Sequence, residues 1–243
     1  MRNLHIIMPM AGEGSRFLKE GWTTPKPLIL LQDKPLFMHA INSVKLDSIK
    51  MKYSFILRSE HIRNYQLDDS IRAILPEANI FSVNNTTRGA VETCLVAEEA
   101  IADDDAVIVM DCDLEFKSKN FEAVIREALT QPATTAIGGA LVSFSSDSPK
   151  YSYAEVDEKG VVVRTAEKEV ISNHALCGAY FFSSGKRFKY VAHELLNEPE
   201  FKKPEFYVSL LYNYLLRDGE TVLLSEMEEY YSYGTPEELK RYL

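Results

Sequence analysis

Hydrophobic positions in the first half of the chain alternate between short apolar runs and longer segments with helical spacing. Leu4–Met8 and Ala106–Met110 are typical of strands, and the second run is apolar at every position. Such a run is expected of a central strand covered on both faces, as in a parallel sheet. Strands that alternate with helices predict a doubly wound α/β layer. The other elements predicted here are strands at Tyr53–Leu57 and Asn79–Val83 and helical segments at Leu36–Val44, Ile62–Leu75, Ala90–Ala100 and Asn120–Leu129, the last with Asn120 as its N-cap.

The pattern changes after Thr134, where β-rich segments follow one another. The turn Asp157–Gly160 suits a hairpin, and Thr235 followed by proline predicts the start of a terminal helix. We therefore expect one continuous sheet, mainly parallel in the first half and mixed in the second. The predicted elements are strands at Ala136–Val142, Tyr153–Val156, Val161–Thr165, Ala179–Phe182 and Thr221–Leu224, and helices at about Lys186–Leu196 and Tyr207–Asp218.

The length of 243 residues and a hydrophobic content of 46% suit one globular domain. We expect a single domain over residues 1–243, which the change of pattern divides into a half to about residue 130 and a half from about residue 131. No apolar run approaches the roughly 20 residues that a membrane span needs. The chain turns into a loop too early for a signal peptide. A cytoplasmic protein is therefore expected, and the apolar segment Tyr207–Leu216 predicts either core or a homodimer interface.

The charge balance argues against nucleic acid as a partner. The chain has 36 acidic residues against 27 lysines and arginines, for a net charge of −9, whereas phosphate backbones require a basic surface. A single small phosphorylated ligand needs only two or three well-placed cations. The three cysteines are odd in number and widely spaced, which argues against disulfides and against a thiolate zinc site and favours free thiols. The five histidines show no ligand spacing and are assigned to core or surface positions.

A glycine-containing loop, Pro9–Phe17, directly follows the first predicted strand. In an open α/β sheet, ligands bind outside the carboxyl ends of the strands, where this loop lies. Gly12 and Gly14 allow backbone amides to approach an anion, while Ser15 and Arg16 add a hydroxyl and a charge. Alone the motif is weak, since it matches neither the dinucleotide fingerprint nor the P-loop.

Two further motifs strengthen the case for a phosphate site. Two prolines around Lys26 stiffen the backbone and present the lysine rigidly. Asp111 and Asp113 follow the most buried strand, and alternate side chains of an extended strand point the same way. Because carboxylate oxygens suit Mg²⁺, and Mg²⁺ suits phosphates, these aspartates are candidate metal ligands.

Together these motifs resemble the sugar-1-phosphate nucleotidyltransferases, also called nucleoside-diphosphate-sugar pyrophosphorylases. The pattern is A-G-x-G-S-R-F, then P-K-P-L, a glycine turn at Arg88–Ala90, and D-x-D. Glu167-Lys168, Cys177–Phe182 and Gly234–Leu239 extend it over nearly the whole chain. The resemblance implies a Rossmann-like three-layer nucleotidyltransferase fold, similar to glycosyltransferase A. It also implies that the half to about residue 130 binds the nucleotide and that the half from about residue 131 binds the acceptor.

The resemblance also implies residue roles. Arg16 and Lys26 would act on the triphosphate, Asp113 with Asp111 would hold Mg²⁺, and Lys168 would bind the acceptor's phosphate. We assign Arg16, Lys26 and Asp113 as catalytic. The nucleotide-binding set is Met10, Ala11, Gly12, Glu13, Gly14, Ser15, Arg88, Gly89 and Asp111, and the acceptor-binding set is Tyr153, Glu167, Lys168 and Gly178.

The implied reaction transfers a nucleoside monophosphate from a nucleoside triphosphate to a sugar 1-phosphate or related metabolite, releases pyrophosphate and serves polysaccharide precursor synthesis. Two departures fall on the acceptor side: Ser232 stands where the family often has a second metal-binding aspartate, and Ser152 where it has a glycine. They keep open a heptose phosphate as the acceptor, or a cytidylyltransferase that acts on a phosphorylated amino acid or amino alcohol. A nucleotide-binding regulatory protein and a glycosyltransferase are further alternatives.

Overall fold

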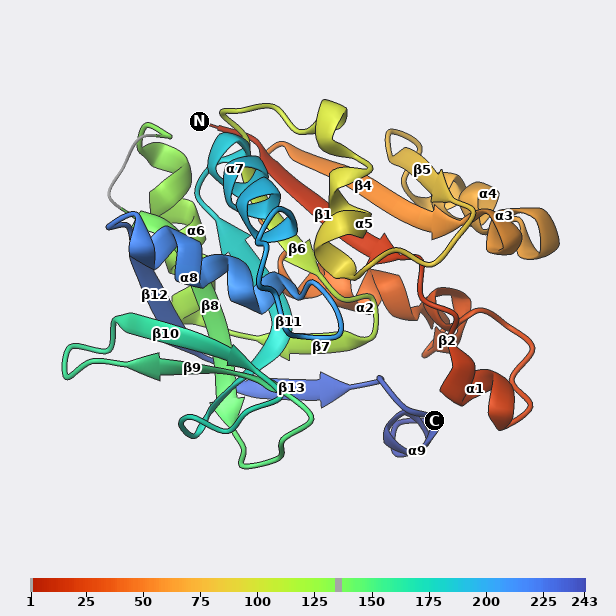
Figure 1. Ribbon diagram of the computed structural model, residues 1–243. Helices are drawn as coiled ribbons and strands as arrows, with labels where there is room; N and C mark the ends of the chain where they lie inside the picture. Colours follow the sequence, from red (N-terminus) through yellow and green to blue (C-terminus); the bar gives the residue numbers. More distant parts are fainter. Residues whose placement is uncertain (1, 134–136) are drawn as a thin grey trace.

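The computed structural model describes residues 2–133 and 137–243, and its central feature is one sheet that crosses both halves of the chain (Figure 1). The strand order is β10-β9-β11-β6-β1-β4-β5, with β8 paired to β11 and β12 paired to β8. The strands are β1 (Leu4–Met10), β4 (Met51–Arg58), β5 (Asn79–Val83), β6 (Ala106–Met110), β8 (Ile137–Ser145), β9 (Ser152–Val156), β10 (Val162–Glu167), β11 (His174–Phe182) and β12 (Thr221–Glu226).

The first-half strands β1, β4, β5 and β6 pair in parallel, as the alternating pattern predicts. In the second half, β11 runs antiparallel to β6, β8 and β9, while β12 is parallel to β8. The expected α/β fold with a mixed second half is therefore confirmed.

The central strand β6 is buried on both faces. Ile108 and Met110 face one hydrophobic core, and Val107 and Val109 face the other, since successive side chains of a strand point to opposite sides. Helices α2, α4 and α6 cover the first face and α5, α7 and α8 the second (Figure 1). The helices are α1 (Ser15–Lys19), α2 (Leu36–Ser43), α3 (Ser59–Tyr65), α4 (Leu67–Ile74), α5 (Ala90–Leu95), α6 (Lys119–Thr130), α7 (Gly185–Leu196), α8 (Leu211–Arg217) and α9 (Pro236–Leu239), with short 3₁₀ turns η1 (Lys26–Leu28), η2 (Glu98–Ala100) and η3 (Val208–Leu210).

Several predicted boundaries need correction. Helix α6 is capped by Ser118, whose hydroxyl accepts a hydrogen bond from Phe121 N, and not by Asn120. The predicted helix Ile62–Leu75 is two helices, because Gln66 between them adopts a left-handed conformation. Strand β1 continues through Pro9 and Met10, which the sequence pattern assigns to the loop. Ala136, the predicted start of one strand, lies outside the described residues.

Two small two-stranded sheets have no counterpart among the predicted elements. β7 (Leu114–Lys117) pairs with β13 (Glu229–Ser232), and β2 (Leu30–Leu31) pairs with β3 (Lys34–Pro35). The β7–β13 pair carries the chain end back to the segment that follows β6. As Figure 1 shows, α9 consequently lies on the same side of the molecule as α1.

A third hydrophobic cluster joins these distant segments. Phe17 of α1, Ile29 and Leu36 pack with Tyr233 and Leu239 from the end of the chain. This cluster lies beneath the loop that carries Arg16 and the turn that carries Lys26, so the C-terminal segment supports residues more than 200 positions away.

The remaining expectations concern burial. The three cysteines are free and buried, as predicted. In the segment Tyr207–Leu216, the side chains of Leu211, Tyr212 and Leu215 are fully buried in the second core, so its apolar face is core.

Across residues 2–133 and 137–243, no helix is long and apolar enough to span a bilayer.

Candidate active site

The loop after β1 is shaped by glycine and held by its neighbours. Gly14 adopts a left-handed conformation with φ of 65° and directly precedes α1. Phe17 in the first turn is buried, which fixes the helix against the third cluster. Arg58 at the end of β4 donates from Nη1 to the carbonyl oxygen of Ala11 at 3.3 Å. Local conformation and tertiary contacts therefore set the path of this loop.

Lys26 begins the short 3₁₀ turn η1, between two prolines. Leu28 N donates to Pro25 O at 2.9 Å and closes the turn. Ile29, which follows, is buried in the third cluster. The lysine is thus presented from a stiff backbone, as its sequence context predicts.

An ion pair joins this turn to the end of the central strand. The Lys26 Nζ atom lies 2.6 Å from Asp113 Oδ2. Burial alone would lower the pKa of Lys26, but the Asp113 carboxylate outweighs it and raises that pKa above its ordinary value. Lys26 is therefore a fixed cation at the carboxyl end of β6.

Asp111 lies against Gly178 of β11. Asp111 N donates to Gly178 O at 2.9 Å, and a Cβ atom at Gly178, where φ is +93°, would collide with the Asp111 carboxylate. Asp111 keeps an exposed surface, but desolvation in the site, followed by the nearby Asp113 carboxylate, raises its pKa above the ordinary value. The two ionised aspartates carry two negative charges, and the Lys26 ammonium group balances one of them. A further cation can therefore balance the other.

Two cavities open on either side of this aspartate pair. The first has a volume of about 250 Å³ and is lined by the β1 loop, the Lys26 turn and the end of β6. Of the predicted nucleotide-side residues, this cavity brings together Met10, Gly12, Glu13, Gly14, Lys26, Asp111 and Asp113.

The second cavity, of about 350 Å³, lies between β11, the β9–β10 strands and the C-terminal segment. Glu167 lines it and is only 6% exposed. The Oε2 atom of Glu167 accepts hydrogen bonds from the hydroxyls of Ser152 and Ser209. Among the described residues, Oε1 of Glu167 has no such partner, which leaves one oxygen of a firmly held carboxylate for a ligand.

The two cavities share Asp111 and Asp113 in their linings. Arg16, from the first helix, borders the second cavity and not the first. A charged group from the segment that follows β1 thus reaches the second cavity.

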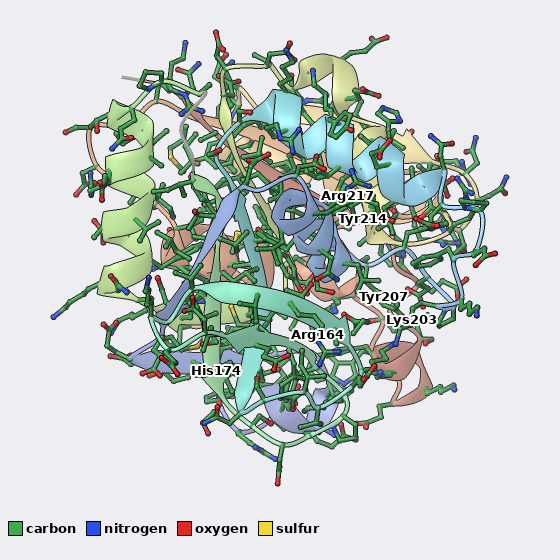
Figure 2. The ribbon with its side chains drawn as sticks, turned by 60° about the vertical axis from the view of Figure 1, so that its left-hand side comes forward. Arg164, His174, Lys203, Tyr207, Tyr214 and Arg217 are labelled. Carbon is green, nitrogen blue, oxygen red and sulfur yellow. The ribbon has the colours of Figure 1, made fainter. Side chains whose placement is uncertain are left out.

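Some predicted residues lie elsewhere. Tyr153 is fully buried and donates to Ser148 O at 2.8 Å, so it does not face the second cavity, whereas its neighbours Tyr151 and Ser152 do. Lys168 is exposed, lines neither cavity and donates to the Tyr207 hydroxyl at 2.9 Å. Figure 2 labels Tyr207, together with Lys203, on the stretch of chain that leads into α8.

Gly89 has a structural reason for being glycine. With φ of +143°, a Cβ atom there would lie 2.5 Å from the backbone nitrogen of Phe206. The Phe206 nitrogen donates to Arg88 O at 2.9 Å, and Val91 N donates to Phe206 O at 3.1 Å. The group that lies close to Gly89 in this structure is therefore the backbone of Phe206. Neither Arg88 nor Gly89 lines either of the two cavities.

The Ser232 position is linked to a carboxylate that the sequence patterns do not single out. The Ser232 hydroxyl donates to Glu238 Oε2 at 2.8 Å, and Lys150 Nζ donates to Glu238 Oε1 at 2.7 Å. Burial opposes ionisation of Glu238, but these two hydrogen bonds outweigh it and lower its pKa. Thr235 caps α9, and Glu238 lies in the first turn of that helix. The capping motif is therefore the sequence signal that indicates the position of Glu238.

The donor set is compatible with Mg²⁺. In the described part of the chain, no group of three or more histidine, cysteine or acidic residues is arranged to hold a metal ion. Mg²⁺ is commonly bound by one or two carboxylates, with phosphates and waters completing the octahedron. Asp111 and Asp113 supply that number of carboxylates beside the first cavity.

Known proteins share the family pattern and the fold of this chain. A family model described as nucleotidyl transferase matches residues 5–228. The fold is similar to the nucleoside-diphosphate-sugar pyrophosphorylase of Vibrio cholerae RC9, with 25% identity, a TM-score of 0.82 and coverage of 98% of this chain and 99% of that one. A protein assigned as a glucose-1-phosphate thymidylyltransferase from Bacillus anthracis, crystallised with sucrose, has a TM-score of 0.76 at 20% identity, covering 98% and 93% of the two chains.

A third solved structure, the inositol-1-phosphate CTP transferase of T. maritima, has a TM-score of 0.74 at 14% identity and covers 100% of this chain and 94% of that one. The family match spans most of the chain, and the parallel α/β half with its mixed second half is the Rossmann-like fold of these structures. The chain belongs to the nucleotidyl transferase family and is a nucleotidyltransferase.

Proposed function

We propose that the first cavity binds a nucleoside triphosphate and the second binds a small phosphorylated acceptor, so that the enzyme transfers the nucleoside monophosphate and releases pyrophosphate. One observation carries the proposal: two cavities with different linings share Asp111 and Asp113. An arrangement of this kind brings two bound substrates to one point, which is the main requirement of phosphoryl-group chemistry.

The proposed reaction is a direct displacement. An anionic oxygen of the acceptor phosphate attacks the α-phosphorus of the nucleotide and forms a new phosphorus–oxygen bond. The bond to the leaving pyrophosphate breaks, and its electron pair leaves with pyrophosphate. Because the attacking oxygen is already anionic, no general base is needed.

The chain's own contribution is charge and position. Lys26, on its stiff turn, neutralises charge on the triphosphate, and Arg16 acts from the side of the second cavity. Asp111 and Asp113 would hold Mg²⁺, which when bound offsets the charge that develops on the phosphates. Gly12, Glu13 and Gly14 line the same cavity.

The acceptor is proposed to carry hydroxyl or amino groups beside its phosphate. Glu167 presents one unpartnered oxygen to the second cavity, and the tyrosines that line it offer flat apolar faces. Both features suit a sugar phosphate, an inositol phosphate or a phosphorylated amino alcohol. A sugar phosphate would make the product a nucleotide sugar of the kind used for polysaccharides. Gly178 lines this cavity and remains a proposed acceptor-side residue, whereas Lys168 is connected to the cavity only through its hydrogen bond to Tyr207.

A substrate panel tests the function. Purified protein is incubated with each of the common ribonucleoside and deoxyribonucleoside triphosphates, Mg²⁺ and one phosphomonoester at a time. The panel includes hexose 1-phosphates, inositol 1-phosphate, phosphocholine and phosphoethanolamine. Release of pyrophosphate that requires both substrates is expected for at least one combination. Pyrophosphate that appears from the triphosphate alone would refute direct transfer between the cavities.

A further inference from the structure

The second cavity contains a lysine that no motif marks, Lys150, on the loop between β8 and β9. Its Nζ atom lies 2.7 Å from Glu238 Oε1 and 4.7 Å from the ring centroid of Tyr151. Half of the Lys150 side chain is exposed, whereas Glu238 is 15% exposed. The ammonium group is therefore held at the wall of the cavity, within reach of a ligand.

Lys168, the lysine that the Glu-Lys motif indicates for this role, is directed elsewhere. Its ammonium group donates to the Tyr207 hydroxyl and lies 4.8 Å from that ring, and Lys168 does not line the cavity. Among the residues that the structure describes, the cations that line the second cavity are Arg16 and Lys150.

The position of Glu238 relates Lys150 to the aspartate pair. A Cβ atom at Gly234 would lie 3.2 Å from Asp113 Oδ2 and 3.4 Å from Glu238 Oε2. The two carboxylates therefore border one narrow gap beside Gly234, in which even a Cβ atom would be tightly packed. Lys26 pairs with Asp113 on one side of this gap, and Lys150 pairs with Glu238 on the other.

We propose that Lys150 is the cation that binds the acceptor's phosphate, and that Glu238 holds its ammonium group in place while the acceptor site is empty. The proposal rests on the proposed function for the identity of the ligand. A phosphate dianion that enters from the second cavity meets Lys150 beside the gap and competes with Glu238 for it. Glu238 is itself steadied by Ser232, so the ammonium group keeps a fixed position before the acceptor arrives.

Binding of inorganic phosphate tests the proposal without knowledge of the acceptor. Phosphate is titrated by isothermal calorimetry at about pH 8 into the wild type, Lys150→Met, Lys150→Arg and Glu238→Gln. The matched control is Lys159→Met, which changes an exposed lysine in the β9–β10 turn. Thermal unfolding of each variant reports whether the fold is retained.

Lys150→Met is expected to weaken phosphate binding by about tenfold, since a charge-assisted hydrogen bond to the phosphate is lost. Lys150→Arg should stay within about threefold of the wild type, because the charge is kept. Glu238→Gln should strengthen phosphate binding by about threefold, because the competing carboxylate is removed. The two substitutions should therefore change phosphate affinity in opposite directions. An ion pair that only stabilises the loop would not produce this difference.

The proposal is overturned if Lys150→Met binds phosphate within twofold of the wild type, or if Glu238→Gln weakens binding as much as Lys150→Met does. Absence of phosphate binding by the wild type at tens of millimolar would also overturn it. None of these results depends on turnover. Failure of the substrate panel and failure of this proposal are therefore separate outcomes.

Discussion

The position of the Lys26 ammonium group depends on the two prolines beside it in the sequence and on one contact in the folded chain. The two flanking prolines set the backbone, and Asp113 sets the position of the ammonium group at 2.6 Å. The sequence predicts the stiff backbone because proline restricts its own φ and the conformation of the residue before it. The contact with Asp113 joins positions 87 residues apart, and only the folded chain reveals it.

Replacing Lys26 by alanine is expected to lower kcat/KM by at least about a hundredfold, because a fixed charge on the triphosphate is lost. The ion pair is partly exposed, so the melting temperature should change little. Steady-state pyrophosphate release and thermal unfolding measure the two effects. Asp113→Ala should behave in the same way, and turnover that survives both changes would contradict the assigned roles.

Other residue-level outcomes show where sequence motifs mislead. The Glu-Lys motif identifies Glu167 in the second cavity, but the side chain of Lys168 is turned to Tyr207. A motif fixes the order of residues along the chain, whereas side-chain direction depends on what packs nearby. Lys150 lies in none of the motifs, and Glu238 lies within the Gly234–Leu239 motif but is given no role by it. The contact between them joins segments 88 positions apart, so the sequence does not reveal it.

At the scale of elements, the regular strands and long helices could be predicted and the short connecting elements could not. β6 coincides with the predicted run Ala106–Met110, because a strand buried on both faces must be apolar throughout. β13 has the sequence Glu-Tyr-Tyr-Ser and is only partly buried, so no hydrophobic pattern marks it. Its formation depends on pairing with β7, which is a tertiary contact.

The C-terminal segment is an element whose effect extends to the nucleotide side. Tyr233 donates from its hydroxyl to Glu115 at 2.9 Å, and His39 Nδ1 lies 2.8 Å from the same carboxylate. Leu239 is fully buried in the third cluster with Phe17. Helix α1, which carries Arg16, and the turn that carries Lys26 therefore pack against the same hydrophobic cluster as the end of the chain.

Leu239→Ala is expected to destabilise the fold by about 2–5 kcal/mol, the usual cost of removing a fully buried leucine. The cluster beneath the nucleotide loop would loosen, so KM for the triphosphate should rise more than KM for the acceptor. Denaturant unfolding and two-substrate kinetics measure these effects. The matched change Leu243→Ala, at an exposed position of the same segment, should do neither.

For the whole molecule, the doubly wound half places the loop of β1 and the end of β6 at one edge of the sheet, because parallel strands end on the same side. This consequence could be predicted from the alternation of strands and helices. The meeting of two cavities at the aspartate pair could not, since it depends on how β11 and the C-terminal segment close over that edge.

Stability of the whole fold should fall in acid through His5, which is fully buried with Nε2 2.8 Å from Ser54 Oγ. Burial lowers the pKa of His5 to about 4. The Asp105 carboxylate opposes this shift, and the Lys52 ammonium group adds a smaller lowering of the same pKa. Because the unfolded state takes up the proton near pH 6.5, this stability is fully present above that pH. It is lost progressively down to about pH 4.

Between pH 7 and pH 5, the loss from His5 should amount to about 2 kcal/mol. Denaturant unfolding at the two pH values measures it, and His5→Gln supplies the comparison because it cannot take up the proton. A variant whose stability changes with pH as steeply as that of the wild type would exclude His5 as the source.

The most direct measurement for the whole enzyme is calorimetric titration of nucleoside triphosphates, with Mg²⁺, into the wild type and Lys26→Ala. At least one triphosphate is expected to bind the wild type with a dissociation constant in the micromolar to millimolar range and to bind Lys26→Ala at least tenfold more weakly. If no triphosphate binds the wild type, the first cavity is not a nucleotide site and the proposed reaction is wrong.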